Sequence, residues 1–322
     1  RKEAKVDEVY LMDEFEDKNN GKLSELIDIL LNILKKFSIS ECIVPKDFPV
    51  FYAEKIKSIG VAIKIEEGEF YPERVIKTKE EKDYIYQTMR TTEGAMQIAE
   101  NMLRKSTVKG NQLFLEGALL TSERIKMELA LFLYKNNCYA DYSIVSCGDQ
   151  GVEPHNQGSG PIYANQTIIV DIFPRSLKTK YFGDLTRTFI KGKPTNEQLK
   201  LFETVKKAQT DALNQLKEGV DGEKVHLGIC DYFEKMGFPT GPIDGKLQGF
   251  IHSTGHGLGL AIHEFPRIAK KTLLLKAGMV VTVEPGLYYY KTGGVRIEDT
   301  VFITETGIEN LTYYHKNFII EE

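Results

Sequence analysis

The sequence has little cysteine, no excess of either charge and no long apolar run. Its four cysteines (Cys42, Cys138, Cys147 and Cys230) are scattered, with no Cys-x-x-Cys pair. This argues against a disulfide framework or a thiolate zinc site and suits a reducing cytoplasm. The net charge of −4 gives no basic field for nucleic acid or anionic membranes. No apolar run approaches a membrane span and no secretory signal is visible; because the sequence begins with Arg1, a trimmed or missing N-terminus is expected.

The rest of the composition is that of an ordinary globular protein, long enough for two domains. Of its 322 residues, 42% are hydrophobic and 27% are charged. Residues 1–75 alternate strand-like and helix-like segments, which predicts a small α/β domain followed by a second domain over 76–322. In the first domain we expect strands over 6–12, 41–44 and 61–65 and helices over 23–37 and 51–59.

The second domain repeats one order of elements, in which two helices are followed by a pair of strands. The first helix of the second copy begins with a capping box, with Thr195 as the cap and Gln198 three residues on. The repeat is one of element order and not of sequence. Its expected helices span residues 80–105, 121–136, 196–216 and 222–236, and its expected strands span 167–172, 181–190, 279–284 and 294–303.

Each expected pair of strands carries two acidic residues. Asp171 ends the first strand of the first pair and Asp184 lies in its partner, while Glu284 and Glu298 take the matching places in the second pair. Alternate residues of a strand face one side, so two facing hairpins would bring four carboxylates together. Buried like charges repel one another unless cations neutralise them, which predicts two divalent metal ions. Each acid taken alone is equally compatible with a solvated loop or an ion pair.

Between the two acidic pairs lies the stretch His252-Ser-Thr-Gly-His256-Gly-Leu-Gly-Leu-Ala-Ile-His263, which holds three of the six histidines. Its glycines are expected to allow close approach of the main chain to a ligand and positive φ angles. Histidine is a common metal ligand and general acid or base. An oxygen-rich ligand set with one imidazole, from His256, suits Mn²⁺, with Co²⁺ or Zn²⁺ as alternatives. Such a metal pair would hold a bridging hydroxide and polarise a carbonyl group.

In combination, these motifs resemble the pita-bread-fold metallopeptidases, and within them the proline-directed branch of Xaa-Pro dipeptidases (prolidases) and Xaa-Pro aminopeptidases. The resemblance covers residues 78–322 and implies an α+β catalytic domain, with residues 1–75 as a shortened, creatinase-like N-terminal domain. The motifs that carry it are Val170-Asp171, Gly183-Asp184-Leu-Thr-Arg-Thr, the three histidines, Val283-Glu284-Pro-Gly-Leu-Tyr288 and Gly294-Val-Arg-Ile-Glu298-Asp. The loop between the first two acids is slightly longer than is usual in the family, which bears on the shape of the pocket.

The resemblance implies a role for each site residue. The implied metal ligands are Asp171 for one ion, His256 and Glu284 for the other, and Asp184 and Glu298 as bridges between them. It further implies that His155, His252 and His263 contact the substrate or help to stabilise the tetrahedral intermediate. Glu284 would also carry a proton, and Arg296 would orient a ligand carboxylate.

The reaction implied is hydrolysis of the peptide bond before proline in dipeptides or short peptides. Arg267 resembles an arginine that captures the substrate carboxylate in archaeal-type prolidases, and the short spacing from Glu284 to Glu298 also favours a dipeptidase. The alternatives are an Xaa-Pro aminopeptidase that acts on longer peptides and a non-catalytic binding module. Methionine aminopeptidase usually lacks such an N-terminal domain, and creatinase does not keep the metal ligands.

Two further expectations follow from the resemblance. Family members are commonly dimers through the N-terminal domain, so a homodimer is expected. A proline ring needs an apolar slot, and the aromatic candidates for it are Phe173, Phe182, Tyr288 and Tyr289.

Overall fold

The computed structural model describes residue 6 and residues 8–16 and 25–321 of the chain. It divides into two compact units, Arg1–Pro72 and Glu73–Glu322, with the division three residues before the boundary expected from the sequence. Among the described residues, no helix combines the length and the apolar character that a membrane crossing needs.

The first unit is a small α/β arrangement. The parallel strands β1 (Glu41–Val44) and β2 (Ala62–Ile65) pair with each other, and the helices are α1 (Leu26–Lys36) and α2 (Val50–Ser58). Its core centres on Leu34, Ile56 and Val61.

The strand expected over residues 6–12 is wrong for the part that the structure describes. Residues 8–11 have no regular structure, and Met12–Glu14 form a 3₁₀ turn. The ring of Tyr10 packs edge-on against the rings of Phe15 and Phe37, so local aromatic contacts replace the pairing that a strand would need. The predicted start of the first helix, at residue 23, lies outside the described residues.

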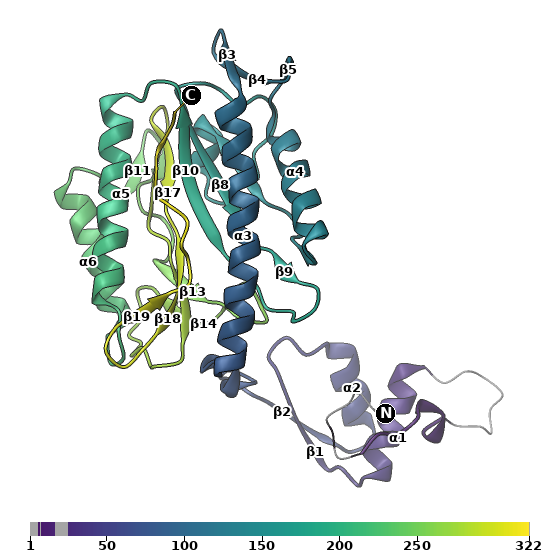
Figure 1. Ribbon diagram of the computed structural model, residues 1–322. Helices are drawn as coiled ribbons and strands as arrows, with labels where there is room; N and C mark the ends of the chain where they lie inside the picture. Colours follow the sequence, from purple (N-terminus) through teal and green to yellow (C-terminus); the bar gives the residue numbers. More distant parts are fainter. Residues whose placement is uncertain (1–5, 7, 17–24, 322) are drawn as a thin grey trace. The chain divides into compact units, whose positions relative to one another are not determined.

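Four helices frame the second unit (Figure 1). They are α3 (Lys79–Lys105), α4 (Ser122–Lys135), α5 (Asn196–Gln215) and α6 (Gly222–Lys235). The capping box predicted at Thr195 and Gln198 is confirmed: the Gln198 amide donates to the Thr195 hydroxyl, and the Thr195 amide donates to the Gln198 side chain. In Figure 1, α3 and α4 flank the strands on one side, and α5 and α6 flank them on the other.

Two sheets lie between these helix pairs. The first has the order β20-β10-β8-β7 and consists of β7 (Ile144–Cys147), β8 (Thr167–Ile172), β10 (Leu185–Lys191) and β20 (Ile319–Ile320). The second has the order β14-β13-β15-β18-β19 and consists of β13 (Gly255–Gly257), β14 (Glu264–Ile268), β15 (Val280–Val283), β18 (Asp299–Ile303) and β19 (Ile308–Asn310). Each helix pair contributes to its own buried apolar core, one built largely from α3, α4 and the first sheet, the other from α5, α6 and the second.

Short strands complete the unit. They are β3 (Thr107–Lys109), β4 (Gln112–Leu115), β5 (Ala118–Leu119), β6 (Cys138–Tyr139), β9 (Arg175–Ser176), β11 (Gly241–Ile243), β12 (Lys246–Gln248), β16 (Gly286–Tyr289) and β17 (Gly293–Arg296). Strand β9 lies in the loop between the first two acids, where it pairs with β6.

The single strand expected over residues 294–303 is wrong, because it is broken in two. Strand β17 pairs with β16, while β18 pairs with β15, and Ile297 and Glu298 lie between them. The reason is a hydrogen bond that the sequence pattern does not contain: the Glu298 amide donates to the Thr186 carbonyl at 3.1 Å. At Glu298 the chain therefore leaves its pairing with β16, makes one backbone hydrogen bond to β10 of the first sheet, and then pairs with β15 as β18.

Candidate metal centre

The four predicted carboxylates come from the ends of buried strands in the two sheets. Asp171 lies in β8, which is buried along its whole length, and Asp184 immediately precedes β10. Glu284 immediately follows β15, and Glu298 occupies the break between β17 and β18. In the antiparallel pair β8–β10, Asp171 stands opposite Thr186, whose hydroxyl donates to Glu298 Oε2 at 2.7 Å. Thr186 therefore links the acids of the first hairpin to those of the second.

His256 faces these carboxylates. Its Nε2 atom lies 3.5 Å from both Asp184 Oδ2 and Glu284 Oε1. One ligand atom each from Asp184, His256 and Glu298 lie within 4.8 Å of one another, and all three residues are buried. The His256 Nδ1 atom is 3.1 Å from the Gly257 carbonyl, which can only accept, so Nδ1 carries the proton and the Nε2 lone pair points at the acids.

The glycines beside His256 serve strand packing and not an unusual backbone conformation. A Cβ atom on Gly255 would lie 1.9 Å from the Thr282 carbonyl oxygen, and one on Gly257 would lie 2.4 Å from the Phe265 carbonyl oxygen. The expected positive φ is wrong, because φ is positive at none of the glycines of this stretch. Only glycine lets β13 lie this close to its neighbours, and this proximity sets the depth of His256.

Asp171 is held differently from the other acids. Its Oδ2 atom accepts from the Arg296 guanidinium at 2.6 Å, while its Oδ1 atom is buried without a hydrogen-bond partner among the described residues. A buried carboxylate oxygen without a partner carries the full cost of its lost hydration. It therefore points to a ligand that the protein itself does not supply.

The pKa values show how unfavourable this cluster is without a cation. Burial, and then the neighbouring carboxylates, raise the pKa of Asp184 and Glu284 well above the usual range, and burial and Asp171 raise the pKa of Glu298 to about 8. Burial lowers the pKa of His256 to about 3, so the imidazole is a neutral ligand. Four convergent carboxylates, one neutral imidazole and one unpartnered oxygen fit a centre for divalent cations.

A hydrogen-bonded chain runs outward from Asp171. Besides holding Asp171, the Arg296 guanidinium donates to the Tyr288 hydroxyl at 2.9 Å, which lies 2.8 Å from His252 Nε2. The His252 Nδ1 atom donates to the Ser253 carbonyl at 2.7 Å, so Nε2 accepts from Tyr288. Burial and the Arg296 charge lower the pKa of His252 to about 3. Both ring nitrogens of His252 are thus bonded within the protein, and its predicted contact with substrate remains a prediction.

The other predicted substrate residues lie at the same end of the second sheet or face it. The exposed His263 places its ring edge-on to the His256 ring, with centroids 4.3 Å apart. Arg267 is the direct cross-strand partner of His256, and its charge contributes to the lowered pKa of His256 and of His263. His155 is exposed on the loop after Val152, and its charge contributes to the lowered pKa of His252. The structure therefore brings all the predicted site residues into one region.

Sequence reasoning missed three residues that organise this region: Thr186, Tyr288 as a partner of His252, and Arg187. Arg187 is almost completely buried in β10 and donates to the Glu298 carbonyl at 2.6 Å and to Asp299 Oδ1 at 2.9 Å. Its Nη2 atom, which donates to Asp299, also donates to the Tyr314 carbonyl, and its Nε atom donates to the His315 carbonyl. An arginine inside an otherwise buried strand was the available signal, since buried arginines need partners.

Replacing Arg187 should destabilise the protein strongly. The Arg187→Met variant leaves Asp299 buried beside a single remaining cation and is expected to lower the free energy of unfolding by about 3–5 kcal/mol. The control is Arg124→Met, because its partner Glu116 is largely exposed, and there the expected loss is below about 1 kcal/mol. Urea denaturation of both variants in EDTA measures the difference. Equal losses of unfolding free energy in the two variants would contradict the role of Arg187 in holding Asp299 and the Glu298 carbonyl.

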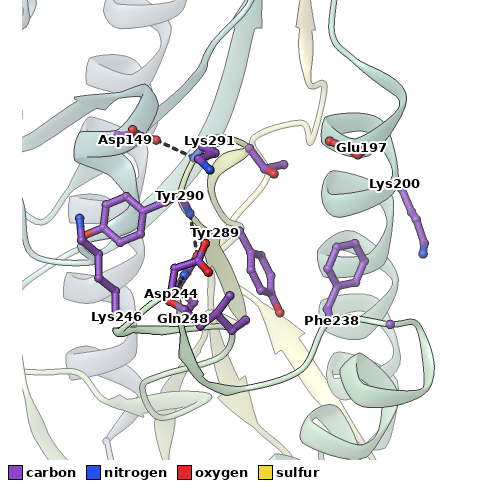
Figure 2. Close-up of a pocket in the computed structure, with 13 residues that line it drawn as sticks. Asp149, Glu197, Lys200, Phe238, Asp244, Lys246, Gln248, Tyr289, Tyr290 and Lys291 are labelled. Atoms are coloured by element: carbon purple, nitrogen blue, oxygen red, sulfur yellow. Dashed lines mark hydrogen bonds between the residues drawn. The ribbon is translucent and has the colours of Figure 1, made fainter.

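A separate pocket of about 620 Å³ lies outside this region (Figure 2). None of the predicted metal ligands or histidines lines it. Tyr289, one candidate for a proline slot, faces this pocket and donates to the Pro239 carbonyl, whereas the preceding Tyr288 faces Arg296. Because successive strand residues face opposite sides, Tyr289 cannot join Tyr288 at the metal centre.

Comparison with known proteins identifies the family of this chain. Residues 84–305, which include every predicted site residue, match the model described as metallopeptidase family M24. The Xaa-Pro dipeptidase of Pyrococcus furiosus is 34% identical over 241 residues, which are 74% of this chain and 63% of that protein. This chain therefore spans less than two thirds of that relative's length.

Solved structures agree with the sequence comparison. An Xaa-Pro dipeptidase from Bacillus anthracis is similar with a TM-score of 0.78 and 27% identity, over 92% of this chain and 79% of that one. An X-Pro aminopeptidase from Thermotoga maritima is similar with a TM-score of 0.76 and 25% identity, over 92% of this chain and 80% of that one. These likenesses confirm the predicted α+β pita-bread fold.

Proposed function

Since the chain belongs to metallopeptidase family M24, we propose that it hydrolyses the peptide bond that precedes proline in dipeptides or short peptides. The observation that carries the proposal is the convergence of Asp184, His256 and Glu298 beside the unpartnered oxygen of Asp171. The named activity of the similar Pyrococcus and Bacillus proteins supports the choice of substrate.

We propose five metal ligands for this centre: Asp171, Asp184, His256, Glu284 and Glu298. By the family resemblance, Asp184 and Glu298 would be shared by two cations, of which Mn²⁺ is the first choice and Co²⁺ or Zn²⁺ the alternatives. Bound divalent cations would polarise the scissile carbonyl and lower the pKa of a water molecule.

The residues of the chain would orient the substrate and move protons. Glu284 is only partly buried, unlike the other three acids, so its carboxylate is open to accept a proton from the attacking water and deliver it to the proline nitrogen. His263 and His155 are exposed beside the acids and can donate to the substrate carbonyl. Arg296 holds Asp171 in place. It also donates to the Tyr288 hydroxyl, which in turn donates to His252 Nε2.

Arg267 favours a dipeptidase over an aminopeptidase. Its position opposite His256 places an exposed guanidinium next to the metal centre, where a fork of donors can bind the carboxylate at the end of a dipeptide. Longer peptides carry no carboxylate at this place. The likeness to the Thermotoga X-Pro aminopeptidase supports the alternative of cleavage of longer peptides.

A substrate comparison tests this assignment. With Mn²⁺, we expect Ala-Pro to be cleaved more efficiently than Ala-Pro-Pro peptides, and Arg267→Ala to lower kcat/KM for Ala-Pro by about 10- to 100-fold, because an ionic hydrogen bond contributes about 1.5–3 kcal/mol. Lys271→Ala, an exposed cation four residues further on, should leave kcat/KM unchanged. Equal cleavage of the longer peptides, with no effect of Arg267→Ala, would favour the aminopeptidase. Absence of both metal binding and hydrolysis would favour a binding module.

We further propose a cytoplasmic protein that forms homodimers. The described cysteines, which are all four of the chain, are free, and this supports a reducing compartment. The dimer is supported by the family resemblance alone, and sedimentation of the metal-loaded protein would test it.

A further inference from the structure

A buried ion cluster lies next to the proposed substrate residues. Glu264, which directly follows His263, accepts from Lys77 Nζ at its Oε1 atom and from the Arg74 guanidinium at its Oε2 atom, both at 2.6 Å. The side chains of Lys77 and Glu264 are only 1% and 9% exposed. The partners are 187 residues apart in the sequence, so this cluster joins the start of α3 to the second sheet.

Lys77 is a fixed anchor and not a free side chain. Its backbone amide donates to the Gly278 carbonyl at 2.8 Å, beside the first residues of β15. Its ammonium also donates to the Arg74 carbonyl at 2.7 Å. The next residue, Thr78, caps α3 by accepting from the Glu81 amide. Lys77, whose ammonium pairs with Glu264, is thus held at the start of both α3 and β15.

The loop that carries His263 is folded around the Glu264 carboxylate. The Ala261 amide donates to Glu264 Oε2 at 3.3 Å. The carboxylate lies directly over Gly259, where a Cβ atom would come within 2.3 Å of Oε1. The Gly259 carbonyl in turn accepts from the Phe182 amide at 2.9 Å, two residues before Asp184.

Glu264 also begins the strand that carries Arg267. In the β13–β14 pair, Gly257 stands opposite Glu264 and His256 stands opposite Arg267, and the register of the two strands shifts between His256 and Gly257. Within the described chain, the His263 ring makes no hydrogen bond to protein, so its position depends on its backbone and on the contact with the His256 ring. The contacts that hold Glu264 therefore also hold His263, which precedes it, and Arg267, which lies three residues further along β14.

We propose that the Lys77–Glu264 ion pair, with Arg74, is a positioning device that holds His263 and Arg267 against the metal centre. The inference rests on the proposed function, since it assigns the pair to the binding of an Xaa-Pro substrate. The pair is desolvated: removing Glu264 leaves Lys77 as a buried charge without its counter-charge, and removing Lys77 leaves Glu264 with only the more exposed Arg74, so either change is expected to displace the loop. The metal ligands come from other segments of the chain, so we expect the metal content to stay unchanged when the loop moves.

Three single variants, one double variant and one control test the proposal. Glu264→Gln keeps the shape of the side chain, and Lys77→Met keeps its length, and each should lower kcat/KM for Ala-Pro by about 10- to 100-fold with unchanged metal content, as losses at residues that support a metal site do. In the double variant, the fold-loss of kcat/KM should be smaller than the product of the two single-variant losses, because both substitutions break the same interaction. Arg74→Gln, which breaks the more exposed arm, should give a smaller loss of the same kind. Lys82→Met, which breaks the more exposed pair between α3 and Glu309 of β19, should leave kcat/KM unchanged.

A second readout does not depend on activity. In NMR spectra of the protein loaded with diamagnetic Zn²⁺, Glu264→Gln should shift the imidazole resonance of His263 and leave that of His315, which pairs with Glu100, in place. An unmoved His263 resonance with wild-type kcat/KM would overturn the positioning role while leaving the proposed function intact. Wild-type protein that binds metal but cleaves no Xaa-Pro peptide would overturn the proposed function, and the His263 resonance would still decide the positioning role. Loss of metal in parallel with activity would show that the cluster is merely structural.

Discussion

The Asp184→Asn protein is expected to lose its metal ions and at least about 10³-fold of its hydrolytic rate, because metal ions supply several kcal/mol of transition-state stabilisation. Asp184 lies 3.5 Å from His256 and within the ligand cluster that includes Glu298. An amide cannot carry the negative charge that would be shared between two cations. Metal analysis after dialysis, together with Ala-Pro hydrolysis, measures both losses.

The same substitution should have the opposite effect on stability when metal is absent. At pH 8 and in EDTA, Asp184→Asn should unfold at a higher temperature than the wild type, because it removes one of four mutually repelling buried carboxylates. Loss of activity combined with a gain in metal-free stability separates a metal ligand from a structural residue. Substitution of a purely structural residue would lower both the activity and the metal-free stability.

Asp299 offers a matched control, since it is a buried acid next to Glu298 that has cations of its own. It accepts from Arg187 at 2.9 Å and from Lys316 at 2.6 Å, and its pKa is lowered despite the burial, chiefly by the charge of Arg187. Asp299→Asn should therefore bind metal normally and be less stable than the wild type in EDTA. If Asp184→Asn and Asp299→Asn changed stability in the same direction, the assignment of Asp184 would be wrong.

Those parts of the fold that depend on short-range pattern were predictable from the sequence. The run Thr167–Ile172 forms β8 with the predicted bounds, and the capping box at Thr195 starts α5. Alternation along the first hairpin was enough to predict that Asp171 and Asp184 face one side, because side-chain direction in a strand is fixed by its pleat.

What the sequence could not predict depends on contacts between distant segments. The break at Glu298 follows from a hydrogen bond to Thr186, more than a hundred residues away, which no local pattern encodes. The occupation of both His252 nitrogens needs the Tyr288 hydroxyl, whereas the sequence suggested Tyr288 only as a candidate for the apolar slot of a proline ring. The partnership of Lys77 with Glu264 likewise arises only once α3 lies beside the second sheet.

A second large effect is expected in the pH dependence of stability. The metal-free protein should lose stability as the pH rises from about 5 to about 8, whereas the Mn²⁺-loaded protein should not. Glu298 illustrates the sign: its pKa is 4.5 as an isolated group and about 8 in the folded protein. Between these values the folded state keeps a proton that the unfolded state releases, so the free energy of unfolding falls with rising pH, by about 1.4 kcal/mol for each unit of a single group's shift.

Asp184 and Glu284 act in the same direction, because burial and neighbouring carboxylates raise their pKa values too. Bound cations remove the effect by holding all the carboxylates ionised. Urea denaturation in EDTA and in Mn²⁺ from pH 5 to 9 measures both slopes, and Glu298→Gln should flatten the slope in EDTA. Asp299, whose pKa is lowered, contributes stability that is lost only as the pH falls into the acidic range, so it cannot produce this slope. A metal-free protein equally stable at pH 5 and pH 8 would mean that the four acids do not share a buried site.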